Sequence, residues 1–268
     1  MSKEKEVIYK GTVAICTPMY GDVAHRVYIN SILLLADALR ENGYGIALYS
    51  VGTESLITKA RNTLVFQALQ TKDLIGILFL DADQGVDPED VLSLIESGKD
   101  VIGAIVPKKT INWAQVRNAV LMKEKEEDLA LYSGQYSVSF LDEKAIEITY
   151  DEPLEVKHVG AGLMYISVQV FEKLKSICKT YRNSEIVEES VEDRIIEFFT
   201  ASITEDTGEL LSEDYTFCEM WRSAGGTVWA APWIQSVHSG TYNFRGSFAR
   251  TVDMVSRLNE LSNSIKKD

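Results

Sequence analysis

The first half of the chain alternates apolar runs with segments of helical periodicity. The apolar runs have the length of buried strands and cover residues 12–17, 45–51, 74–80 and 101–106. The segments between them place apolar residues on one helical face and cover residues 25–42, 57–69 and the stretch that begins at Pro88. Asp87 suits the N-cap of that last helix, and Pro88 its first position. This alternation predicts a sheet with right-handed crossovers and helices on its faces, as in nucleotide-binding α/β proteins.

The pattern changes after Trp113. Alternation and turn residues between about 120 and 159 predict hairpins. The sequence then predicts a strand over 158–167, a helix over 168–180, an acidic surface loop over 182–214, a helix over 213–224 and a strand over 227–231. From residue 249 onward, the pattern is that of an amphipathic helix. We expect one domain over 1–268, with a nucleotide-binding half (about 11–115), a second half (about 116–248) and a C-terminal helix.

The composition narrows the classes of function. A net charge of −13 counts against proteins that hold nucleic acid through its phosphates, since these usually present a basic surface. A divalent cation would let such a chain hold an anionic nucleotide. No apolar run approaches the roughly 18 residues of a membrane span, and the charged start is unlike a secretory signal, so we expect a cytoplasmic protein. The three cysteines form no CxxC pair and predict neither a zinc site nor a disulfide framework.

The strongest chemical signal is Asp81-Ala82-Asp83, which directly follows the apolar run 74–80. Ligands of α/β sheets bind where parallel strands end. Two carboxylates placed there offer hard oxygen ligands to Mn²⁺ or Mg²⁺, which can bridge to a diphosphate. The simpler alternative is that Asp83 only begins a turn. The position at the strand end favours a site that binds a metal ion and a diphosphate.

Other segments carry weaker signals, and each has a structural alternative. Lys108 follows the run 101–106 and could bind phosphate groups. The alternative is that it is one of two adjacent lysines that face solvent. Trp113 suits stacking on a sugar, or closes the core. Gly160 and Gly162 permit close approach to an acceptor sugar, or mark a bulge. Tyr20 offers a stacking surface in a strand-end loop, or is an ordinary surface aromatic.

Taken in order, these segments resemble GT-A fold glycosyltransferases that are family-2-like and similar to phage and bacterial members. The resemblance covers about residues 13–246 and is carried by six short motifs: Thr17-Pro18-Met19-Tyr20, Ala60-Arg61-Asn62, Asp81-Ala82-Asp83, Gly160-Ala161-Gly162, Ser212-Glu213-Asp214-Tyr215 and His238-Ser239-Gly240. It implies a GT-A mixed sheet flanked by helices. It also implies a metal-dependent enzyme that moves a sugar from a UDP- or GDP-sugar to a hydroxyl group.

The resemblance also implies roles for single residues. Thr17, Pro18 and Tyr20 would lie at the nucleoside, and Arg61 and Asn62 beside the base or first phosphate. Asp83 and His238 would bind the metal, and Asp81 would bind it with them or touch the ribose or a metal-bound water. Asp214 would be the general base of an inverting reaction, with Glu213 beside it. The structural alternative for Asp214 is that it is the N-cap of a helix. The structural alternative for His238 is that its ring only forms hydrogen bonds within the protein.

The acceptor stays open between a glycan, a small molecule and modified phage DNA such as a hydroxymethylated pyrimidine, and so does the oligomeric state. Two other functions compete. One is a non-catalytic nucleotide-sugar-binding protein, which the retained acidic residues disfavour. The other is a sugar nucleotidyltransferase, but the first loop lacks the Gly-rich, basic sequence that holds a triphosphate.

Overall fold

A computed structural model describes residues 7–142, 149–182, 194–242, 248 and 250. Its centre is an eight-stranded sheet with the order β2-β1-β3-β8-β5-β13-β7-β6. The strands are β1 (Gly11–Pro18), β2 (Tyr44–Val51), β3 (Leu74–Leu80), β5 (Val101–Ala104), β6 (Val138–Phe140), β7 (Leu154–Val159), β8 (Leu163–Ser167) and β13 (Val228–Ala231). β1 runs parallel to β2 and β3, and β13 parallel to β5, whereas β8 is antiparallel to both of its neighbours. The expected mixed α/β sheet flanked by helices is confirmed.

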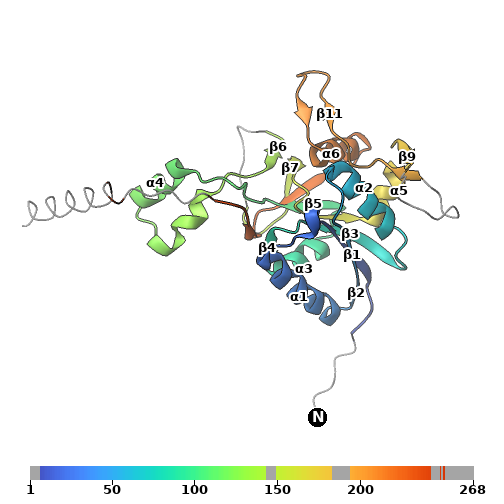
Figure 1. Ribbon diagram of the computed structural model, residues 1–268, viewed down its shortest axis with the longest axis horizontal. Coiled ribbons are helices and arrows are strands. Elements are labelled where there is room, and N and C mark those ends of the chain that lie inside the picture. Colours follow the sequence, from blue (N-terminus) through green and yellow to red (C-terminus); the bar gives the residue numbers. More distant parts are fainter. Residues whose placement is uncertain (1–6, 143–148, 183–193, 243–247, 249, 251–268) are drawn as a thin grey trace, which may run out of the picture.

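The sheet is covered on both faces because its strands are apolar on both sides. Successive residues of a strand point to opposite faces. Accordingly Ala14 and Cys16 pack in one core with α2 (Ile57–Ala68), α5 (Val168–Leu174) and α6 (Glu213–Ser223), while Val13 and Ile15 pack in the other. The second core includes residues of α1 (Arg26–Glu41) and α3 (Pro88–Glu96). Figure 1 shows these two helical layers on either side of the sheet.

The local signals at helix ends are confirmed. The Asp87 side chain accepts a hydrogen bond of 2.9 Å from the backbone N–H of Glu89, and Pro88 is the first residue of α3. α1 ends just before Gly43, which has a φ of +87°, a value that glycine adopts without strain.

The remaining elements lie around the sheet. η1 (Tyr20–Asp22) follows β1, and β4 (Gln84–Val86) follows β3 and pairs with β14 (Ser236–His238). α4 (Trp113–Leu121) lies apart from the sheet at one side of the molecule (Figure 1) and is followed by η2 (Glu126–Ser133). β9 (Thr180–Arg182) pairs with β10 (Arg194–Ile196), and β11 (Ser202–Ile203) pairs with β12 (Leu210–Leu211). No helix within the described ranges has both the length and the apolar character that a membrane crossing needs.

Four expectations about the second half need correction. The hairpins expected over about 120–159 are confirmed only by the β6–β7 pair, because residues 126–133 form η2. α4 covers residues 113–121, for which no element was predicted. The expected strand over 158–167 is two strands, β7 and β8, interrupted at residues 160–162. α5 ends at Leu174 and not near 180, and the expected loop over 182–214 contains β10, β11 and β12. The amphipathic helix expected from residue 249 lies outside the described residues.

Candidate functional site

The segment Asp81-Ala82-Asp83 lies where β3 ends and is fixed there by backbone hydrogen bonds. The N–H of Asp81 donates to the carbonyl of Gly162 (2.9 Å), and the carbonyl of Ala82 accepts from the N–H of His25 (2.8 Å). The carbonyl of Asp83 accepts from the N–H of Ser239 (2.8 Å). Three segments that are distant in the sequence therefore meet at the carboxyl end of β3, the edge at which α/β sheets bind ligands.

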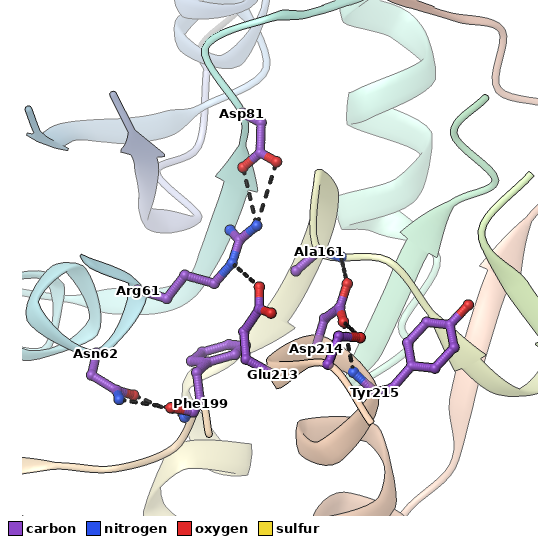
Figure 2. Close-up of polar contacts among 9 residues, drawn as sticks. Arg61, Asn62, Asp81, Ala161, Phe199, Glu213, Asp214 and Tyr215 are labelled. Carbon is purple, nitrogen blue, oxygen red and sulfur yellow. Dashed lines mark hydrogen bonds and ion pairs between the residues drawn. The ribbon is translucent and has the colours of Figure 1, made fainter. Parts of the chain in front are cut away.

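Arg61 on α2 joins the two acidic pairs of the sequence, as Figure 2 shows. Its Nη2 donates to the carboxylate oxygens of Asp81 at 3.2 and 3.4 Å, and its Nε donates to Glu213 Oε1 at 3.1 Å. The guanidinium group lies 5.1 Å from the centroid of the Phe79 ring, and the residue is only 3 % exposed. Arg61 is thus a buried bridge between the end of β3 and the start of α6.

Burial and charge act in opposite directions on these groups. Removal from water lowers the pKa of Arg61, but the carboxylates of Asp81 and Glu213 outweigh it and raise that pKa. For Asp81, removal from water is the largest effect and raises the pKa of the carboxyl group, while Arg61 acts against the increase. One guanidinium nitrogen, Arg61 Nη1, is buried without a hydrogen-bond partner.

Asp83 faces two cationic side chains on its other side. Lys109 Nζ forms an ion pair with Asp83 Oδ2, and His238 Nε2 lies 3.4 Å from Asp83 Oδ1. Burial would raise the pKa of Asp83, but hydrogen bonds from His238 and Lys109 lower it to about 2. The hydrogen bond to Asp83 also raises the pKa of His238. The Lys109 side chain passes over Gly240, where a Cβ atom would lie 2.7 Å from Lys109 Cδ.

The tautomer of His238 follows from its second contact. Nδ1 lies 2.7 Å from the carbonyl oxygen of Pro107. A carbonyl oxygen only accepts hydrogen bonds, so Nδ1 carries the proton. In the ring that donates to Asp83, Nε2 is protonated as well. Loss of that proton would free the Nε2 lone pair, as in a metal-ligating histidine whose other nitrogen is held by a carbonyl.

The three expected metal ligands do not share one centre. Asp83 and His238 face each other, whereas Asp81 is directed at Arg61. Across the described part of the chain, no group of three or more His, Cys, Asp or Glu side chains is arranged to hold a metal ion. A cation site with three protein ligands therefore stays a prediction.

Asp214 lies in the first turn of α6, beside the break between β7 and β8. Its Oδ2 accepts a hydrogen bond of 3.2 Å from the N–H of Ala161, and its Oδ1 accepts from the Ser212 hydroxyl and from the N–H of Tyr215 (2.9 Å) (Figure 2). The N-cap position belongs to Ser212, so the alternative of Asp214 as the N-cap is wrong. A Cβ atom at Gly160 would lie 3.6 Å from Asp214 Oδ2, and one at Gly162 would lie 3.4 Å from Asp81 Oδ2.

A cavity of about 410 Å³ opens beside the acidic segment. Pro18, Tyr20, His25, Glu54, Asp81, Ala82 and Asp83 are among its lining residues. Tyr20 is 72 % exposed, so most of this residue is open to solvent. His25 and Glu54 were not singled out from the sequence, because neither belongs to a motif; only their proximity to the loops after β1 and β2 indicates them.

Other expected site residues have structural contacts. The Thr17 hydroxyl is buried and bonds to the hydroxyl of Tyr28 (2.9 Å). Asn62 uses both ends of its amide on the backbone of Phe199, at 2.8 and 2.9 Å. The backbone N–H of Lys108 donates to Gln135 (2.6 Å) and its side chain is exposed, while its neighbour Lys109 is the lysine that contacts Asp83.

Trp113 begins α4, away from this edge, and is 63 % exposed. Closure of the core by Trp113 is therefore wrong, and stacking on a sugar stays a prediction.

No protein-family model matches the chain, and no curated protein matches it. Among solved structures, the chain is similar to the crystal structure of A197 from STIV, with a TM-score of 0.46, 16 % sequence identity and coverage of 86 % of each chain. A likeness at this level assigns no activity to the chain.

Proposed function

We propose that this chain is a metal-assisted glycosyltransferase that moves a sugar from a UDP- or GDP-sugar to an acceptor hydroxyl. The observation that carries the proposal is the bridge formed by Arg61. It holds the acidic segment after β3 and the acidic pair at the start of α6 in one site, at hydrogen-bond distance from both. A donor-binding edge and a candidate base thereby meet at the carboxyl end of the sheet.

Asp83 and His238 are the residues that would hold the cation. Neighbouring ligands of an octahedral cation with bonds of about 2.0–2.1 Å lie about 2.8–3.0 Å apart. His238 Nε2 and Asp83 Oδ1 are 3.4 Å apart, so both would reach one cation after a shift of about half an ångström. Carboxylate oxygen and imidazole nitrogen both suit Mn²⁺. When bound, Mn²⁺ or Mg²⁺ supplies positive charge that stabilises the leaving diphosphate.

The donor would occupy the cavity beside Asp81-Ala82-Asp83. Its volume of about 410 Å³ lies within the range of small-molecule sites, about 300–1,000 Å³. Tyr20 lines this cavity with an exposed ring, which would stack on the base. Lys109 would contact the diphosphate, because its Nζ lies at Asp83, and it is therefore a better donor-binding candidate than Lys108.

Asp214 is the candidate base. In the reaction, the acceptor oxygen would bond to the anomeric carbon, the bond from that carbon to the diphosphate would break, and the diphosphate would leave with the electron pair. The acceptor proton would pass to Asp214 Oδ2, the oxygen that faces residues 160–161. Glu213 is held by Arg61 and would act as a positioning residue.

The test is a donor-hydrolysis screen across UDP- and GDP-sugars, with Mn²⁺, with Mg²⁺ and with a chelator. We expect slow, metal-dependent hydrolysis of one donor, which Asp83→Asn and Asp214→Asn each lower at least tenfold. Asp37→Asn is the matched control, since Asp37 is exposed and contacts Arg40 on the surface. UDP or GDP binding without hydrolysis would indicate a binding protein instead, and full activity in Asp83→Asn would refute the cation site.

A further inference from the structure

The carboxylate of Asp83, the proposed ligand of the cation, has a basic side chain at each of its oxygen atoms. Lys109 Nζ forms an ion pair with Oδ2, and His238 Nε2 lies 3.4 Å from Oδ1. The side chain of Asp83 is 24 % exposed and that of Lys109 is 42 % exposed, so solvent and ions reach both groups. Lys109 therefore contacts one of the two oxygen atoms through which Asp83 would bind a cation.

The position of the Lys109 side chain depends on Gly240, two residues after His238. The stem of Lys109 passes over Gly240, where a Cβ atom would lie 2.7 Å from Lys109 Cδ and 3.2 Å from Cγ. The first of these distances is too short for a real contact, so a side chain at this position would displace the stem. The N–H of Ser239 donates to the carbonyl of Asp83 at 2.8 Å, which fixes this backbone beside the carboxylate. Packing over Gly240, as well as charge, therefore brings Lys109 to Asp83.

The loop that carries Lys109 is held by bonds that do not involve its ammonium group. The N–H of Lys108 donates to the carbonyl of Gln135 at 2.6 Å, and the hydroxyl of Thr110 donates to the side-chain oxygen of Gln135 at 3.2 Å. Removal of the ammonium group should therefore leave the backbone of this loop in place. Lys108 has an exposed side chain on the same loop and serves as a reference for the effect of charge alone.

We infer that Lys109 competes with the cation for Asp83 and moves to the diphosphate of the donor when the cation binds. This inference rests on the proposed function. An ammonium group and a divalent cation at one carboxylate repel each other, so the cation binds more weakly while Lys109 stays at Asp83. A bound diphosphate offers Lys109 another anionic partner, which its flexible four-carbon stem allows it to contact.

The exchange couples the cation to the nucleotide through one side chain. Without nucleotide, Lys109 at Asp83 weakens binding of the cation. With both ligands bound, Lys109 contacts the diphosphate, so each ligand strengthens binding of the other. Lys109 thus changes its partner without any covalent step.

The experiment measures two dissociation constants for each variant. The Kd of Mn²⁺ without nucleotide is measured by electron paramagnetic resonance, from the signal of the free ion. The Kd of UDP and of GDP is measured by calorimetry at saturating Mn²⁺, and circular dichroism checks the fold. Lys109→Met removes the ammonium group, whereas Gly240→Ala keeps it but displaces its stem. Lys108→Met is the matched control for charge, and Asp83→Asn tests the cation site itself.

We expect Lys109→Met and Gly240→Ala each to lower the Kd of Mn²⁺ about threefold to fivefold, the equivalent of one partly exposed ion pair. Lys108→Met should change it by less than about 1.5-fold, since exposed charges that make no contact interact weakly. At saturating Mn²⁺, Lys109→Met should raise the Kd of the nucleotide about tenfold, the equivalent of one hydrogen bond between charged groups.

Several results would overturn the inference without touching the proposed function. One is an unchanged Kd of Mn²⁺ in Lys109→Met, in a protein whose Mn²⁺ binding Asp83→Asn abolishes. Tighter binding in Lys109→Met but not in Gly240→Ala, or equally tight binding in Lys108→Met, would show that net charge is responsible and not the contact with Asp83. An unchanged Kd of the nucleotide in Lys109→Met would refute the move to the diphosphate.

A different result would overturn the proposed function as well. If none of these proteins binds Mn²⁺, and UDP and GDP bind equally well with and without Mn²⁺, there is no cation for which Lys109 competes, and the metal-assisted reaction is refuted with the inference. Binding of Mn²⁺ that persists in Asp83→Asn would place the cation elsewhere and have the same consequence.

Discussion

The buried bridge of Arg61 makes a quantitative prediction about stability. Its side chain is 4 % exposed, and those of Asp81 and Glu213 are 29 % and 12 % exposed. At an effective dielectric constant of about 20, each ion pair at its distance of 3.2 or 3.1 Å has a Coulomb energy of about 5 kcal/mol. Burial of the guanidinium and the two carboxylates costs several kcal/mol for each ion, so the intact network contributes little net stability.

Arg61→Met removes the cation and leaves the two carboxylates partly buried and uncompensated. We therefore expect a loss of about 3–5 kcal/mol in the free energy of unfolding. The triple variant Arg61→Met, Asp81→Asn, Glu213→Gln should recover most of that loss, because no unpaired charge is left in the network. Arg40→Met is the control, with an expected change below about 0.5 kcal/mol, since that side chain is 66 % exposed and its ion pair is on the surface.

The assay is urea-induced unfolding followed by circular dichroism, with the slope checked for each variant. A cost below about 1 kcal/mol for Arg61→Met would show that the network is not buried in the folded protein. A triple variant as unstable as Arg61→Met alone would show that packing against Phe79, and not charge, is what Arg61 supplies.

Four further predictions concern single residues. Asn62→Ala breaks both hydrogen bonds to Phe199 and should lower the free energy of unfolding in urea by about 2–3 kcal/mol. Steady-state kinetics should show an unchanged KM for the donor. Gly160→Ala should lower kcat at least tenfold with a change in Tm below about 2 °C, since the methyl group fits yet lies beside the proposed base. Tyr20→Ala should weaken UDP or GDP binding about fivefold to twentyfold in calorimetry without changing the Tm. Burial lowers the pKa of His158, so the imidazole is protonated more readily in the unfolded chain. Stability should therefore fall as the pH drops below about 6.5. His158→Phe should reduce the decline in Tm between pH 7 and pH 5.

Local signals in the sequence predicted much of the fold. The apolar run of β3 and the Asp87–Pro88 start of α3 agree with the structure because each depends only on neighbouring residues. The place of β8 between β3 and β5 was not predictable in this way, since it depends on pairing with segments 60–90 residues away. α4 was missed because it buries only Ala119 and so carries no clear apolar face.

The candidate site shows the same limit at the level of side chains. The position of Asp81-Ala82-Asp83 at a strand end followed from the sequence, but the direction of each side chain did not. Arg61 was expected beside the base or first phosphate of the donor, and it lies buried between two carboxylates. Asn62 follows Arg61 directly, and its amide is occupied by the backbone of Phe199. The residue types predicted that both side chains form hydrogen bonds. Only the packing of the fold decides whether their partners are atoms of a ligand or of the protein.

Arg61 contacts only one member of each acidic pair. It forms ion pairs with Asp81 of the pair after β3 and with Glu213 of the pair at the start of α6. In the proposed function the other member of each pair would contact the ligands: Asp83, which lies beside His238, and Asp214, which lies beside residues 160–161. Four carboxylates at one edge would repel one another and an anionic diphosphate, and a single buried cation offsets this repulsion. If this division is correct, Glu213→Gln will lower stability more than it alters the chemical step, and Asp214→Asn will do the reverse.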